Sequence, residues 1–164
     1  MLTNIPAFID YFERVRRRTL LFFNRLPPEH IDWAPRTGEF TCGDLIRHVA
    51  AAEQMFAEVA AGGRWVYPGH NRERGQSLPQ ALDYLAVSHS SAIALISTLD
   101  QGELQFSRTA VGGKPIEVWR VLMLMVEHEI HHRSQFAEYL TQLGIAPPQI
   151  YGLKLEDLLA QIAG

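Results

Sequence analysis

The chain contains one cysteine, Cys42, among its 164 residues. No disulfide can therefore form within the chain, and this cysteine usage is typical of proteins from a reducing compartment. Residues 1–18 include four arginines and two acidic residues, and they lack the apolar stretch of a secretion signal. We therefore expect a cytoplasmic protein.

Long apolar runs and an excess of positive charge are also missing. No segment is apolar for long enough to span a bilayer, so we expect no membrane partner. The formal net charge is −3 at pH 7, which gives no electrostatic support for binding nucleic-acid phosphates. The basic cluster at residues 14–18 is short and is typical of a solvated helix face. We therefore expect no nucleic-acid partner either.

Apolar residues recur at helical spacing in four long segments. Hydroxyl residues stand at two of the expected starts, where Thr41 precedes Asp44 and Ser77 precedes Gln80 in the pattern of a capping box. The expected helices cover about 5–24, 41–62, 77–100 and 115–143, followed by a short closing helix in 153–163. With 47% hydrophobic residues, a chain of this length predicts one domain spanning 1–164. The expected fold class is all-α, a four-helix bundle with a short C-terminal helix.

A brief hairpin is expected before the fourth helix. Gly112 and Gly113 lie between two strand-prone stretches of the segment 106–119.

The segment "MLMVEHEIHHRSQF", residues 123–136, crowds three histidines and a glutamate into five positions. His128 and His132 lie one helical turn apart on a face that otherwise carries core residues such as Met125 and Phe136. Two imidazoles at this spacing can converge on one cation. His131 points to another side of the helix. One alternative is a polar helix face, and another is that the inward histidines are hydrogen-bonded core residues and not ligands.

A third ligand must come from another helix, and His48 is the leading candidate. It replaces an apolar residue in the stripe that includes Leu45, Val49 and Ala52. His89 shares a stripe of the third helix and is a further inward candidate. The remaining histidines, His30 and His70, fall in expected loops without a helical-face argument. The predicted metal ligands are therefore His48, His128 and His132.

The same run matches the H-E-x-x-H pattern of zinc peptidases, in which the glutamate activates water. No further histidine follows His132, and no evident strand would hold an extended peptide, so we do not favour a peptidase. Glu129 remains the candidate catalytic residue, as a general base or as a group that orients a ligand. A solvated glutamate is the alternative.

Two stretches carry a resemblance to a known family. "WAPRTGEFTCGDLIRHVAAAE" at 33–53 and "VEHEIHHRSQF" at 126–136 resemble the first-histidine helix and the H-x-x-H-H-R-G-Q signature of the DinB-like (DinB/YfiT) superfamily of metal-dependent enzymes. Ser134 stands where the signature has glycine. The resemblance implies a four-helix bundle, often a homodimer, in which three histidines, matching His48, His128 and His132, hold a divalent metal.

The resemblance leaves the reaction open, because fold alone does not select a function. Some similar families are transferases or isomerases that use bacillithiol, mycothiol or glutathione. We expect a metal-dependent thiol S-transferase or hydrolase with a small-molecule substrate, holding zinc, nickel or iron and using a low-molecular-weight thiol as a second cofactor. The alternatives are a metal-binding bundle without catalysis and a structural helical dimer. The loop 62–77, with Trp65, Tyr67 and His70, either shapes the mouth of a pocket or is solvated.

Overall fold

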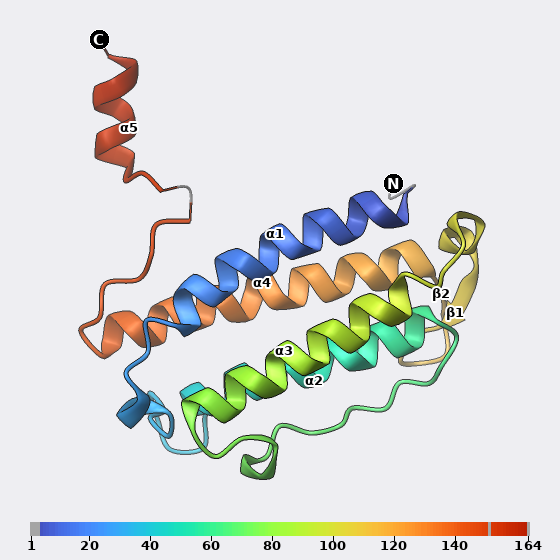
Figure 1. The fold of residues 1–164 in the computed structure, drawn as a ribbon, viewed down its shortest axis with the longest axis horizontal. Helices are drawn as coiled ribbons and strands as arrows, with labels where there is room; N and C mark the ends of the chain where they lie inside the picture. Colours follow the sequence, from blue (N-terminus) through green and yellow to red (C-terminus); the bar gives the residue numbers. More distant parts are fainter. Residues whose placement is uncertain (1–3, 151, 164) are drawn as a thin grey trace.

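Helices make up most of the chain, as the sequence predicts (Figure 1). The computed structural model describes residues 4–150 and 152–163. Within these ranges the helices are α1 (Ile5–Phe23), α2 (Cys42–Ala60), α3 (Leu78–Ile96), α4 (Val118–Gln142) and the short α5 (Leu155–Ile162). Short 3-10 helices lie in the connections: η1 (Pro28–His30), η2 (Arg72–Arg74) and η3 (Gln101–Gln105). The all-α prediction of a four-helix bundle with a short C-terminal helix is confirmed.

Side-chain caps start α2 and α3 where the sequence predicts them. The Thr41 hydroxyl accepts a hydrogen bond from the Asp44 N–H at 3.0 Å, and the Asp44 carboxylate accepts one from the Thr41 N–H at 2.9 Å. Ser77 and Gln80 form the corresponding box at the start of α3. Each box satisfies backbone donors that the first helical turn leaves unpaired.

The expected hairpin precedes α4. Strand β1 (Ser107–Thr109) pairs in antiparallel register with β2 (Pro115–Glu117). Gly112 and Gly113 in the turn have φ values of 96° and 82°, a conformation that glycine adopts without steric cost. Because residues 115–117 are paired as a strand, α4 begins at Val118 and not near residue 115. Similarly, α3 ends at Ile96, earlier than predicted, and η3 follows.

The long helices do not simply alternate in direction. Figure 1 shows α1 and α4 running one way and α2 and α3 running the other. The contacts agree, because α2 and α3 pack side by side along their length while α4 packs against α1 and α2. Since α2 and α3 are parallel neighbours, their connection, residues 61–77, has to travel back along the bundle (Figure 1).

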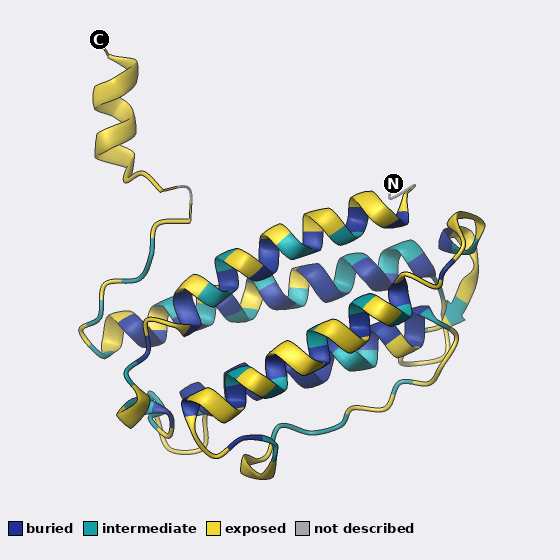
Figure 2. Ribbon diagram, viewed as in Figure 1, coloured by how far each residue is buried: buried dark blue, intermediate teal, exposed yellow. Residues whose placement is uncertain are grey.

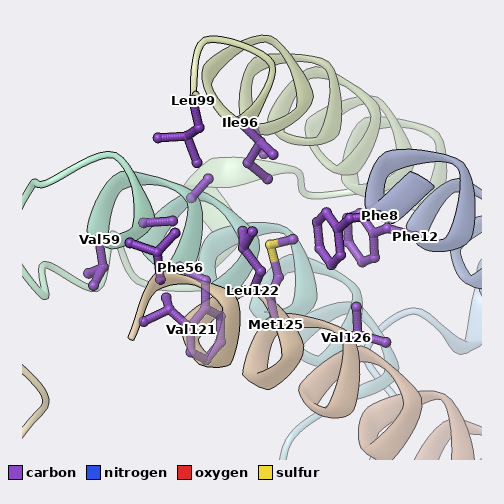
Figure 3. Close-up of a cluster of buried hydrophobic side chains, with 14 of the residues drawn as sticks. Phe8, Phe12, Phe56, Val59, Ile96, Leu99, Val121, Leu122, Met125 and Val126 are labelled. Atoms are coloured by element: carbon purple, nitrogen blue, oxygen red, sulfur yellow. The ribbon is translucent and has the colours of Figure 1, made fainter. Parts of the chain in front are cut away.

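The long helices bury one face and expose the other (Figure 2). The buried apolar residues form two clusters with buried polar residues between them. One cluster, around Phe8, Phe12 and Met125, lies near the start of α1 (Figure 3). The other includes Phe23 and Phe136. Along α1, α3 and α4, buried polar residues separate the members of the two clusters: Arg16, Thr19, Ser88, Glu129 and Arg133. The bundle therefore has a polar layer in its interior.

The C-terminal helix forms at the predicted position but stands away from the bundle (Figure 1). All of its residues are exposed, including Leu155, Leu158, Leu159 and Ile162. Among the described residues, no helix has both the length and the apolar character needed to cross a membrane.

Candidate metal centre

The structure brings together the three histidines that the sequence predicts as metal ligands. His48 lies on α2, and His128 and His132 lie one turn apart on α4. One ring nitrogen from each of these side chains lies within 4.8 Å of those of the other two. The shortest separation is 3.0 Å, between Nε2 of His128 and Nε2 of His48. That these residues bind a metal remains a prediction, but their convergence is a finding.

The antiparallel packing of α2 against α4 produces this convergence. Each histidine is half-buried, so the group lies between the core and the surface. The rings of His48 and His132 meet edge to face with centroids 4.6 Å apart, and those of His128 and His132 are 4.4 Å apart. Phe40 packs on the ring of His48 and Phe56 on that of His128. These aromatic contacts restrict how far the imidazoles can rotate.

Hydrogen bonds at the far side of two rings determine which nitrogen faces the centre. Nδ1 of His48 lies 2.6 Å from the Tyr67 hydroxyl. Nδ1 of His132 lies 2.9 Å from Oε1 of Gln135. Gln135 in turn donates to the Tyr139 hydroxyl, which donates to the Phe40 carbonyl. Such partners orient metal-binding imidazoles in known sites, because they leave Nε2 directed at the ion.

Burial and mutual repulsion favour the neutral form of these histidines. Burial, followed by the charges of His132 and His70, lowers the pKa of His48 to about 4. Burial together with the neighbouring histidines lowers the pKa of His128 to about 3. The pKa of His132 is also lowered, mainly by burial, although its hydrogen bond to Gln135 acts in the opposite direction. Neutral imidazole is the form that binds a metal ion.

The donor set fits a divalent transition metal. Two ligand nitrogens at about 2.0–2.1 Å from an ion are separated by about 3.3 Å at a tetrahedral angle. The 3.0 Å between the Nε2 atoms of His48 and His128 is close to this separation. Three protein nitrogens would also leave coordination positions for a small molecule, which is the arrangement of catalytic and not of structural zinc sites.

Glu129, the predicted catalytic residue, has its hydrogen bonds elsewhere. It is buried on the side of α4 that faces α1, where Oε2 lies 2.7 Å from Nη2 of Arg16 and Oε1 lies 3.1 Å from Nε. The same guanidinium contacts Glu53 at 2.6 Å. These contacts place the carboxylate of Glu129 in an internal ion pair. Its catalytic role stays a prediction. His89, the other inward candidate, contacts Glu53 and Glu13 and is not part of the triad.

Two residues of the 62–77 loop belong to the centre, although neither lies on a predicted helix face. Tyr67 bonds to His48, and its hydroxyl also lies 2.7 Å from Nδ1 of His70. The His70 ring packs on Phe40 and meets the ring of His48 edge to face. The loop therefore borders the site, in agreement with the interpretation that it shapes the mouth of a pocket and not with the interpretation that it is solvated. The only signal in the sequence was its content of aromatic and histidine residues.

Comparison with known proteins places these features in a family. A sequence model of the DinB superfamily matches residues 11–136, which include all three histidines. The uncharacterized protein YjoA of Bacillus subtilis (strain 168) is 22% identical over 139 residues, covering 83% of this chain and 88% of YjoA.

Two solved structures share the fold. A DinB-like protein from Bacillus cereus ATCC 10987 superposes with a TM-score of 0.75 at 20% identity, covering 91% of this chain and 99% of that one. The structure of B. subtilis YjoA gives a TM-score of 0.71 at 19% identity, covering 88% and 96% of the two chains. At these identities the likeness shows the fold alone, whereas the sequence match extends over most of the bundle. The chain belongs to the DinB superfamily.

Proposed function

We propose that this chain is a divalent-metal-dependent enzyme that acts on a small molecule, with His48, His128 and His132 as its metal ligands. The observation that carries the proposal is the convergence of three half-buried imidazoles from two helices. The lowered pKa values of His48 and His128 support it further, because both rings are available as neutral ligands at pH 7. This donor set suits zinc, nickel or iron.

A cation held by three imidazoles would lower the pKa of a water or thiol bound to it and so supply a nucleophile near neutral pH. The chain's own side chains would orient the ligands. Gln135 accepts from Nδ1 of His132 and so leaves Nε2 of that ring for the centre, and the Tyr67 hydroxyl lies at Nδ1 of His48 on the side away from the centre. The aromatic rings of Phe40 and Phe56 limit the access of water to two of the ligands.

The reaction we favour is a thiol-dependent S-transfer or a hydrolysis. Cys42 does not provide the thiol, because it is fully buried and burial raises its pKa to about 12. A thiol reactant would therefore come from solution, as a low-molecular-weight thiol such as bacillithiol, mycothiol or glutathione. A homodimer belongs to the same proposal on the strength of the family resemblance, and light scattering of the purified chain would measure its mass.

The first test is elemental analysis of untagged protein purified without added metal or chelator. We expect close to one divalent ion per chain, lost in His48→Ala and in His128→Ala. The matched control is His30→Ala and not His131→Ala, because the ring of His131 lies 4.9 Å from that of His132. His30 lies in η1 and is not one of the three grouped histidines. The metal content of His30→Ala should equal that of the unaltered protein. Circular dichroism of each variant reports whether the bundle has folded.

A second measurement separates an enzyme from its alternatives. Metal-loaded protein is mixed with a low-molecular-weight thiol and an electrophile, and loss of free thiol is followed with and without His128→Ala. Hydrolysis of ester and amide substrates is followed in parallel. Metal bound stoichiometrically without either activity would favour a bundle in which the ion joins α2 to α4. A folded protein that takes up none of zinc, nickel or iron would overturn the metal-dependent proposal and leave a structural bundle.

A further inference from the structure

The loop that borders the centre is held in a defined position by a buried side chain next to a ligand. Arg47 precedes His48 on α2 and is 1% exposed. Its Nε donates to the His70 carbonyl at 2.9 Å, and its Nη1 donates to the Gly75 carbonyl at 2.6 Å. Asp44 binds the remaining arm of the guanidinium at 2.7 Å. The helix turn that presents His48 therefore also fixes the backbone of the loop.

Other contacts extend this attachment along the loop. Arg74 donates to the Pro68 carbonyl at 2.5 Å, and its guanidinium lies near the ring of Tyr84 on α3. Trp65 donates to the Thr109 carbonyl and packs edge to face on Phe56. Tyr67 thus lies between anchored points on both sides, so its ring reaches His48 from a supported backbone.

The hydroxyl of Tyr67 joins two imidazoles in one hydrogen-bonded chain. It lies 2.6 Å from Nδ1 of His48 and 2.7 Å from Nδ1 of His70. A phenol has a single proton, so it donates one of these bonds and accepts the other. Without a metal both directions are open, because Nε2 of His48 can either donate to Nε2 of His128 or accept from it.

A metal ion would remove this choice. A ligand Nε2 carries no proton, so neutral His48 would keep its proton on Nδ1 and donate it to the Tyr67 oxygen. The phenol proton would then point to Nδ1 of His70, which must be the acceptor. With a metal bound, His48 would donate to Tyr67 and Tyr67 would donate to His70. This order leaves Nε2 of His48 without a proton and directed at the centre.

We infer that Tyr67 is the positioning residue for the His48 ligand. His70 completes the hydrogen-bonded chain by accepting the proton of the Tyr67 hydroxyl. This inference rests on the proposed metal centre and deepens it. His132 is oriented by Gln135 from within its own helix, whereas His48 is oriented from a separate loop. Metal affinity therefore depends on the conformation of residues 61–77 through one hydroxyl group.

The experiment compares Tyr67→Phe, His70→Ala and Tyr11→Phe with the unaltered protein. Tyr67→Phe keeps the ring and removes only the hydroxyl. Tyr11→Phe is the matched control, because Tyr11 lies on α1 and is 43% exposed, close to the 39% of Tyr67. Zinc affinity is measured by competition with a chromophoric chelator, and thermal unfolding of the zinc-free proteins reports any loss of fold.

We expect Tyr67→Phe to weaken zinc binding by about 10- to 100-fold, the range found when partners of metal-binding imidazoles are removed. His70→Ala should weaken binding in the same direction by less, and Tyr11→Phe should leave it unchanged. Proton NMR of the zinc-bound protein gives a readout that packing alone would not change. The His48 Nδ1–H should exchange slowly with water in the unaltered protein and rapidly in Tyr67→Phe.

Two negative outcomes are distinguishable. Unaltered protein that binds no zinc, nickel or iron would overturn the proposed metal centre itself and, with it, this inference. Unaltered protein that binds zinc, with equal affinity and equally slow Nδ1–H exchange in Tyr67→Phe, would overturn only the positioning role of Tyr67.

Discussion

Arg16 on α1 and Glu129 on α4 form an ion pair in the interior of the bundle, with Nη2 2.7 Å from Oε2 and both side chains at most 4% exposed. The same Nη2 lies 2.6 Å from Oε2 of Glu53 on α2, so one guanidinium holds two buried carboxylates from two other helices. These attractions raise the pKa of Arg16 even though burial acts in the opposite direction. The three charged side chains therefore connect α1, α2 and α4.

Removing the cation should destabilise the fold strongly. Arg16→Met would remove the guanidinium that holds both buried carboxylates and would leave Glu53 with only His89 as a cationic partner. The loss of one partner from a buried ion pair costs about 3–5 kcal/mol of unfolding free energy. Urea denaturation measures this quantity. Arg14→Met is the matched control, because the Arg14–Asp10 pair is 60% and 59% exposed and should contribute less than about 1 kcal/mol. Equal losses in both variants would contradict the role of Arg16.

Helical periodicity in the sequence identifies the inward histidines but does not identify the partner of Glu129. His48, His128 and His132 were recognisable because each replaces an apolar residue in a helical stripe. Glu129 follows His128 by one residue, so it points about 100° away around the helix axis. Sequence alone does not determine which neighbour lies on that side, and the neighbour is Arg16, more than a hundred positions earlier.

Loops carry no comparable periodicity, which is why Tyr67 and His70 were only aromatic and polar loop residues in the sequence. Their place at the centre depends on α2 and α3 being parallel, since the connection must then pass back along the bundle (Figure 1). It depends also on Arg47, whose buried guanidinium binds two loop carbonyls. The sequence shows only that an arginine precedes His48, and nothing in its pattern indicates which distant carbonyls this arginine binds.

The environment of His89 should make the stability of the fold depend on pH. Its Nδ1 lies 2.6 Å from Glu53 and its Nε2 lies 3.1 Å from Glu13, so both nitrogens face carboxylates. Burial lowers the pKa of His89, as Arg16 does, but the hydrogen bond and charge of Glu53, helped by Glu13, raise it overall. A raised pKa in the folded state means that the stabilisation is complete below the unfolded pKa, about 6.5. It is lost as pH rises through the folded value.

We therefore expect the difference in unfolding free energy between the unaltered protein and His89→Gln to shrink as pH rises above about 6.5. The difference between the two proteins cancels the contributions of His48 and His128, whose lowered pKa values act at lower pH and with the opposite sign. Urea denaturation across this range measures it. A difference that grows with pH would show that His89 is neutral in the folded state.

The lowered pKa values at the metal centre predict the proton balance of metal binding. At about pH 5.5, three histidines with the ordinary pKa of about 6.5 would release more than two protons when they bind zinc. His48 and His128, with pKa values near 4 and 3, are already neutral at that pH. Calorimetry in two buffers of different ionisation enthalpy should detect release of less than about one proton. Release of two or more would contradict the lowered pKa values.

Gly75 provides a test of how closely the loop must approach α3 for the centre to form. It has a φ of 144°, and a Cβ built there would lie 2.7 Å from the backbone nitrogen of Ala81. Gly69, in the same loop, has a φ of 88° and open space around its Cβ position. Gly69→Ala should therefore show only the conformational cost of about 1–2 kcal/mol, while Gly75→Ala adds a steric clash with backbone.

Because the Gly75 carbonyl is one of the two that Arg47 holds, the displaced loop should also carry His70 and Tyr67 away from His48. We expect Gly75→Ala to weaken zinc binding by about tenfold or more, as the loss of an orienting partner does, and Gly69→Ala to weaken it less. Zinc competition and urea denaturation on both variants measure the two effects. If Gly75→Ala lowered stability but left zinc affinity intact, the ligand geometry would be independent of the loop, and α2 and α4 alone would define the centre.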